Sequence, residues 1–299
     1  MTRYPGADGI VRAVIDRERV HNQGRVAGTA VVRSVATKLF APLSAAFREA
    51  NVGFSPLSIT LALGMLRAGA EGVSATEFDA LFGIDGSAVP PALNAVDQRL
   101  ADLDGGAPDP RDGFDAHAHV SLANALWGQH GITWHQPFLD TLASDYGAGM
   151  RVVDYKSDPE ACRLLINGWV GERTHGKITH LLEPGTVTDD HRLVLTNALW
   201  FKAAWLHTFL DAPDGLFTKT SGERLEVPRM SASSELLGYR RGDGWQSLRV
   251  PYVGGQLAMT LVLPDAGGDD AVVRPGHRHR PPRGAVGYRC RITVHRRDR

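Results

Sequence analysis

The chain has 299 residues, a formal net charge of zero and a hydrophobic fraction of 43%, which is enough for one large folded domain or two ordinary ones. Its two cysteines, Cys162 and Cys290, exclude a disulfide framework, so the fold must depend on a hydrophobic core. The N-terminus carries charges throughout and is unlike a secretory signal, and no window approaches the roughly 18 apolar residues of a membrane span. We therefore expect a cytoplasmic protein that has no membrane partner.

The zero net charge conceals an asymmetry along the chain. Residues 271–299 hold nine of the 33 basic residues and one of the 33 acidic residues, Asp298. The first 270 residues therefore carry 24 basic and 32 acidic side chains. A block of like charge is typical of a solvated tail or of a segment that contacts a polyanion.

The first half of the chain is predicted to be mainly helical. Residues 1–34 are polar and weakly patterned, and we expect a loose lead-in there. Apolar residues then recur at helical spacing over 35–50, with Pro42 expected to kink the helix. Ser55 can cap the next helix, which is apolar on almost all sides over 57–66 and is therefore expected to be buried.

Strand patterns dominate the rest of the chain. Alternation is visible near 117–127 and a strand is expected at 150–155, followed by a helix that begins at Asp158 and ends near Gly176. The remaining strand candidates lie at 193–201, 224–230, 234–241, 245–252 and 256–264. Helices followed mostly by strands indicate an α+β fold with antiparallel sheets.

The letters NALW occur twice, at 124–127 and 197–200, in the same phase of an alternating pattern. If these stretches are strands, Asn124 and Asn197 each lie on an otherwise apolar face. A buried amide without a partner costs about 1–3 kcal/mol, so Asn197 must find hydrogen bonds nearby. For Asn124 we keep the simpler interpretation of a polar residue with a structural role.

Six stretches, in this order along the chain, resemble the serpin family. The resemblance spans residues 35–265 and implies an α+β, serpin-like fold, with N-terminal helices packed on antiparallel and mixed sheets. The stretches are "NVGFSPLSI" (51–59), "GAEGVSATEFDALFG" (69–83), "INGWVGERTHGKITHLL" (166–182), "LVLTNALWFKAAWLHTF" (193–209), "VPRM" (227–230) and "LRVPYVGGQLAMTLVLPD" (248–265).

The resemblance implies a role for several polar residues. In serpins a central sheet opens to admit a strand, and Ser55, Ser58 and Asn197 match a polar cluster beneath the opening point, called the shutter. Trp205 resembles the tryptophan at the top of the same sheet, where the loop enters. A polar lock between strands can be exchanged, whereas an apolar seam would resist separation.

Two further residues match the end of a helix that lies across the sheet in serpins. These are Thr174 and Gly176, and the glycine is expected to end the helix. We interpret both as residues of the fold that take no part in chemistry.

The resemblance also implies an activity. Serpins are suicide inhibitors of serine-type endopeptidases: the protease cleaves an exposed reactive loop, and the loop then inserts into the central sheet while the protease is still attached. Strand insertion of this kind releases stored strain and is a known serpin behaviour. The implied partner is a serine protease, and no cofactor or metal is needed. Many serpins are exported, so an extracellular location is the alternative to a cytoplasmic one.

The resemblance stops after Asp265. Residues 266–299 are rich in Arg, Pro, Gly and His, and none of them matches a reactive loop or the final core strands. We expect this tail to be disordered and the chain to be inactive as an inhibitor. The abrupt change of composition suggests a shifted reading frame, and the absence of a serpin-like ending from all frames of the coding DNA would refute that hypothesis.

Two other functions were weighed. The basic tail could make the chain a non-inhibitory protein that binds nucleic acid or a sulfated glycan; a salt-dependent gel shift that is lost when the chain ends at Asp265 would test this. An enzyme is not expected, because the sequence has no G-x-S-x-G or H-E-x-x-H motif. His117 and His119 share a strand face, but two histidines without a third ligand do not indicate a metal site.

Overall fold

The computed structural model describes residues 9–11, 13, 15–19, 22–47, 50–103, 118–219, 222–234, 237–265 and 290–295. The chain divides into two compact units. The first comprises Met1–Asp104 and His119–Phe201, and the second comprises Gly105–Ala118 and Lys202–Arg299. Each unit is considered by itself.

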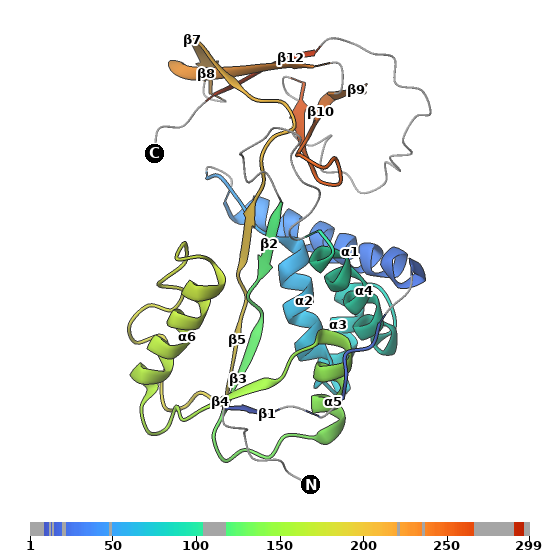
Figure 1. Cartoon of the computed structure of the whole chain (residues 1–299), viewed down its shortest axis with the longest axis vertical. Coiled ribbons are helices and arrows are strands. Elements are labelled where there is room, and N and C mark those ends of the chain that lie inside the picture. Colours follow the sequence, from blue (N-terminus) through green and yellow to red (C-terminus); the bar gives the residue numbers. More distant parts are fainter. Residues whose placement is uncertain are drawn as a thin grey trace. The chain divides into compact units, whose positions relative to one another are not determined.

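The first unit contains the helices and a mixed four-stranded sheet (Figure 1). The sheet has the order β1-β4-β3-β5; β3 and β4 are parallel, and the other neighbours are antiparallel. A two-stranded ladder of β2 and β6 accompanies it. The strands are β1 (Ile10–Val11), β2 (His119–Leu122), β3 (Ala125–Gln129), β4 (Met150–Val153), β5 (Leu193–Thr196) and β6 (Leu199–Lys202). The helices are α1 (Asn22–Ala46), α2 (Pro56–Arg67), α3 (Gly72–Phe82), α4 (Val89–Ala101), α5 (Gln136–Tyr146) and α6 (Pro159–Arg173).

The sheet is covered on both faces, with α6 on one side of β3 and β5 and the other helices on the opposite side (Figure 1). On the α6 face, Trp127 and Val153 pack with Ile166. On the opposite face, Leu126 and Met150 pack with side chains from α2 and α5. Covering both faces with apolar layers is the arrangement that gives a sheet its core.

Two helices begin as their sequences predict. Ser55 is the N-cap of α2, and its hydroxyl accepts a hydrogen bond from the Ser58 amide at 3.2 Å. Asp158 is the N-cap of α6, and its carboxylate accepts one from the Ala161 amide at 2.9 Å. Each side chain satisfies an amide that the first helical turn leaves without a backbone partner, and local sequence is enough to specify this.

The N-terminal segment differs from the expected loose lead-in over residues 1–34. Its described part contains β1, which pairs with β4, and α1 already begins at Asn22. Val11 and Ala13 are buried in the same core as Met150. The helical spacing before Val35 is weak because α1 buries few of its residues, which is why sequence periodicity did not reveal its first turns.

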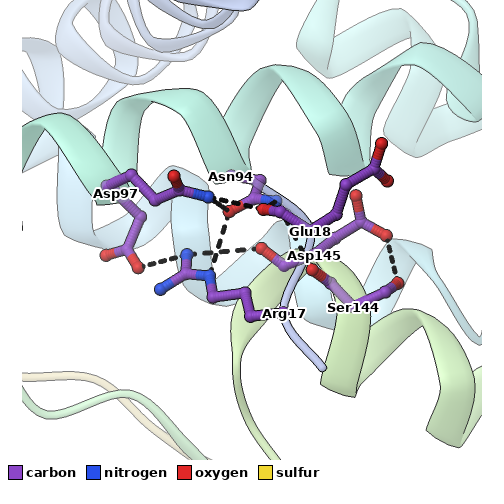
Figure 2. A network of polar contacts seen from close by, with 7 residues as sticks. Arg17, Glu18, Asn94, Asp97, Ser144 and Asp145 are labelled. Carbon is purple, nitrogen blue, oxygen red and sulfur yellow. Dashed lines mark hydrogen bonds and ion pairs between the residues drawn. The ribbon is translucent and has the colours of Figure 1, made fainter. Parts of the chain in front are cut away.

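A polar network holds residues 15–19 against α4 and α5 (Figure 2). The centre of the network is Asn94, whose side chain is fully buried. Its amide nitrogen donates to the carbonyl oxygen of Glu18 at 2.9 Å, and its amide oxygen accepts from Arg17 Nε at 3.0 Å. Arg17 also pairs with Asp97 at 2.6 Å, and the Glu18 amide donates to the Ser144 carbonyl at 2.8 Å.

One helix is longer and more apolar than the sequence analysis allowed. The stretch Gly24–Ala46 of α1 has a mean hydropathy of 1.2 in its most apolar window, which by length and composition alone would suit a membrane span. In this fold Val31 and Val35 are fully buried against α2 and α4, together with Leu61 and Leu93. Helices of soluble cores satisfy the same criterion, so the length and hydropathy of α1 are weak evidence for a membrane span.

The second unit is built from antiparallel strands. Three of its elements match predicted strands, namely β8 (Arg224–Ser234), β10 (Trp245–Pro251) and β11 (Ala258–Pro264). The predicted strand at 234–241 is displaced toward the C-terminus as β9 (Gly238–Gly242), and β7 (Leu210–Thr218) was not predicted. The sheets have the orders β11-β10-β9 and β12-β8-β7.

The last strand, β12 (Cys290–His295), lies in the tail for which the sequence predicts disorder. It pairs with β8 in antiparallel register, from Cys290 opposite Ser234 to His295 opposite Arg229. This part of the prediction differs from the structure, because mean composition conceals the short run "CRITVH", in which Ile292 and Val294 alternate with polar residues. The remainder of the tail lies outside the described residues.

Candidate functional site

The two NALW stretches lie opposite each other in the first unit. β3 and β5 are antiparallel, with Ala125 opposite Thr196. Two positions further along, Ala123 and Ala198 exchange backbone hydrogen bonds of 2.8 and 3.2 Å. The position between these two bonded pairs holds the two asparagines, so Asn124 and Asn197 are cross-strand neighbours. Side chains approach most closely at such a non-hydrogen-bonded position.

The asparagines interrupt the strands that contain them. The sequence predicts continuous alternation through both stretches, whereas the structure separates β2 from β3 and β5 from β6 at this level. The alanines beside the asparagines face α6, where Ala123 and Ala198 pack with Val170. The asparagines face the opposite way and contact the start of α2.

Asn197 has the hydrogen-bond partners that the sequence requires. Its amide nitrogen donates to the Ser58 carbonyl at 2.8 Å and to Asn124 Oδ1 at 2.6 Å. Its amide oxygen accepts from the Ser58 hydroxyl at 3.2 Å, and Ser58 itself is 2% exposed. Ser55 takes part indirectly, because it fixes the Ser58 amide. We name these four residues, Ser55, Ser58, Asn124 and Asn197, the asparagine cluster.

Asn124 therefore belongs to the cluster, although the sequence gave it only a structural interpretation. Periodicity says that Asn124 and Asn197 lie on apolar faces, but it does not say that the two faces are the same one. The repeat of NALW in equal phase was the available signal. It becomes informative once the two strands are known to be antiparallel neighbours.

The cluster predicts an energetic coupling between the two asparagines. In a double-mutant cycle of Asn124→Ala and Asn197→Ala, we expect the two losses in the free energy of unfolding to differ from additivity by about 1 kcal/mol, because each change removes the same hydrogen bond. Urea unfolding followed by circular dichroism measures each corner. As a control, Asn197→Ala combined with Gln98→Ala in α4 should be additive within about 0.5 kcal/mol. Additivity of the two asparagine changes would contradict the cluster.

The end of α6 differs in detail from the prediction. The helix ends at Arg173, and the C-cap residue is Thr174, which is fully buried and accepts a hydrogen bond from the Ile178 amide at 3.1 Å. The left-handed position directly after the cap is occupied by His175, with φ 52°, and Gly176 follows with φ 72°. The Gly176 amide donates to the Gly171 carbonyl at 2.8 Å, which completes a Schellman turn.

His175 has a role at the end of α6 that the sequence does not reveal. A histidine in the left-handed region is strained, and its ring lies 4.0 Å from that of Trp200 between centroids. The Trp200 ring also lies 6.1 Å from that of His119. The contact of the His175 ring with Trp200 of β6 therefore supports the left-handed backbone conformation at His175, which a glycine would adopt more easily. The same contact joins the end of α6 to β6.

Trp205 belongs to the second unit. Its ring stacks on Tyr252 with a centroid distance of 4.3 Å and an interplanar angle of 15°, and it meets Phe209 edge-on at 5.7 Å. Trp205, Phe209 and Leu248 pack beside the buried residues Leu237 and Val250. Trp205 is therefore part of a small apolar cluster of the second unit, and the role in loop entry that the resemblance implies remains a prediction.

Within the described part of the chain, no three His, Cys, Asp or Glu side chains are grouped to hold a metal ion. His117 lies outside the described residues, so its pairing with His119 stays a prediction. Burial raises the pKa of the Cys162 thiol, which keeps it protonated and weakly nucleophilic at neutral pH.

The fold and the asparagine cluster define a protein of mixed helices and sheets with a polar joint between two strands of its main sheet. The family model described as "Serpin (serine protease inhibitor)" matches residues 30–273. The chain belongs to the serpin family.

Similar curated proteins carry inhibitor names. The chain is 33% identical over 233 residues to leukocyte elastase inhibitor A of Rattus norvegicus, which covers 77% of this chain and 59% of that protein. It is 32% identical to serpin B8 of Homo sapiens, in a match that covers 80% of this chain and 62% of that protein. It is 34% identical to serpin-ZXA of Oryza sativa subsp. japonica, in a match that covers 78% of this chain and 60% of that protein. The chain therefore spans about three fifths of the length of these relatives.

Solved structures support the fold. Ovalbumin from emu (Dromaius novaehollandiae) superimposes with a TM-score of 0.72 at 20% identity, over 90% of this chain and 73% of that one. Arabidopsis AtSerpin1, in its native stressed conformation, superimposes with a TM-score of 0.67 at 24% identity, over 85% of this chain and 65% of that one. The α+β serpin fold is confirmed.

Proposed function

We propose that this chain carries the sheet-opening part of a serine protease inhibitor, and that the asparagine cluster is the latch between the sheet and α2. Three hydrogen bonds of Asn197, two to Ser58 and one to Asn124, carry the proposal. In each of the three bonds, water or the backbone of an incoming strand can take the place of the present partner, so the bonds can be exchanged one at a time. An apolar seam would have to be exposed to water when the strands part, at a cost proportional to its area.

The position of the cluster supports this role. Within the described part of the first unit, β5 is the last strand of the sheet and pairs only with β3. Its other edge is therefore the one at which a further strand could add. Asn197 directly follows Thr196, the last residue of β5. A strand that adds at the free edge of β5 would therefore shift backbone that is bonded to Asn197.

We also propose that residues 1–299 do not trap a protease by themselves. The family model matches residues 30–273, and no stretch of 266–299 resembles a reactive loop. A serine protease is the partner that the family description indicates, and its identity depends on a loop that this sequence does not show.

A trapping assay tests this second proposal. Incubation with trypsin, chymotrypsin and elastase, followed by denaturing electrophoresis, should show the protease at its own mass and no stable complex. Leukocyte elastase inhibitor A incubated with elastase serves as the positive control for the assay. A protease-dependent band that survives denaturation and has the summed mass of both proteins would contradict the proposal.

A further inference from the structure

One edge strand of the second unit carries exposed apolar side chains on both of its faces. The strand is β11, which pairs with β10 alone within the described residues. Leu261 and Leu263 lie on one face and are 37% and 60% exposed, and Val262, on the other face, is 46% exposed. The strand has no charged residue from Ala258 to Pro264. An apolar edge without charges is a site at which a further strand can pair.

The register of β11 shows which of its backbone groups are open. Just beyond its last residue, the Asp265 amide donates to the Gly244 carbonyl at 2.9 Å. Backbone bonds alternate along an antiparallel strand, so the odd-numbered residues of β11 are the ones that bond to β10. The amides and carbonyls of Ala258, Thr260 and Val262 therefore point away from β10. Within the described residues, these groups have no hydrogen-bond partner.

Two other strand edges of the second unit have features that oppose pairing. β9, at the other edge of the same sheet, has Arg240 and Arg241 in succession. β7, at one edge of the sheet with the order β12-β8-β7, contains Pro213 and two aspartates, and its register shifts between Ala212 and Gly215. Charges, prolines and bulges are the usual means by which sheet edges avoid pairing. Of these three edges, β11 alone has neither charges nor a bulge, and proline occurs only as its last residue.

We propose that two copies of this chain associate through β11, in antiparallel pairing about a two-fold axis, and form a closed dimer. A second copy offers the same uncharged strand, so no like charges meet across the paired strands. In the register that uses every open amide, Thr260 lies opposite Thr260 of the second copy and Ala258 lies opposite Val262. Registers shifted toward the C-terminus bring in Pro264, which has no amide hydrogen to donate. This inference does not depend on protease inhibition.

The same register brings apolar side chains together. Leu261 lies opposite Met259 of the second copy, and Leu263 lies opposite Leu257, at the non-hydrogen-bonded positions where side chains approach most closely. Apolar cross-strand pairs stabilise antiparallel sheets, and the pairing removes exposed leucine surface from water. Because each copy contributes its β11 edge to the one interface, only the arginine-bearing β9 edges of this sheet stay open, and the assembly stops at two chains.

Sedimentation equilibrium of the full chain tests the proposal. In a concentration series from about 1 μM to about 200 μM, the measured mass should rise from that of one chain, 32.4 kDa, toward that of two chains and no further. A mass of one chain throughout the series would refute the dimer. A mass that continues to rise beyond two chains would refute its closed, two-fold pairing.

Two variants of β11 locate the interface. Val262→Lys places like charges in the pairing, and Thr260→Pro removes an amide that β10 does not use. Each should weaken dimerisation at least about tenfold, with an unchanged circular dichroism spectrum. The matched control Leu216→Lys adds the same charge at a position of β7 that is 64% exposed, and it should leave the dimerisation constant within about twofold. Undiminished dimerisation of either β11 variant would overturn the proposal, as would an equal loss in the control.

Discussion

Replacing Trp127 with alanine is expected to lower the free energy of unfolding by about 3–5 kcal/mol. The side chain is 1% exposed and fills the core between β3 and α6. Its ring meets that of Trp169 edge-on at 5.6 Å, and its indole nitrogen donates to the Thr196 hydroxyl at 3.1 Å. Truncation leaves a cavity and removes one of the two rings that lie beside Arg151. It also removes the donor to the Thr196 hydroxyl, which keeps its own bond to the Ala125 carbonyl at 3.3 Å.

Urea unfolding followed by far-ultraviolet circular dichroism measures this loss without depending on tryptophan fluorescence. The control Trp127→Phe keeps a ring in the core and removes the indole donor, so it should cost roughly 1–2 kcal/mol. A loss below about 1 kcal/mol for the alanine variant would show that α6 does not pack on the sheet as described.

Replacing Asn94 with alanine is expected to cost about 2–3 kcal/mol and to release the segment 15–19. The amide is fully buried and bonds both to Arg17 and to the carbonyl of Glu18. Its loss leaves that carbonyl with Gln98 as its remaining side-chain partner, at 2.7 Å. Hydrogen exchange of the Glu18 amide, which bonds to Ser144 at 2.8 Å, should become faster.

The ion pair in the same network supplies the control. Arg17 and Asp97 are 29% and 27% exposed and lie 2.6 Å apart. Because solvent screens such a pair, Asp97→Ala should cost no more than about 1 kcal/mol and should leave exchange at Glu18 nearly unchanged. If the two variants behave alike, Asn94 is not the residue that holds the segment.

Much of the fold was predictable because its signals are local. The N-caps Ser55 and Asp158 act on amides three residues away. The apolar α2 and the alternation of β10 and β11 depend on spacing within one element. The family resemblance depends on six such stretches in order, and it also placed Ser58 and Asn197 together. These features follow from short-range geometry, which a sequence expresses directly.

The remaining features needed contacts between distant residues. Asn124 bonds to a partner 73 residues away, and Asn94 to one 76 residues away. His175 adopts a left-handed conformation that Trp200, 25 residues further on, packs against. The repeat of NALW draws attention to Asn124, but no local pattern identifies the partner of any of these residues.

The sequence by itself thus determined the family, most helices and strands and the polar character of the asparagine cluster. Tertiary structure alone decided that β1 pairs with β4 and that both asparagines share one cluster. The physical reason is that periodicity specifies which side of an element is apolar, whereas the choice of which elements meet is made by long-range packing.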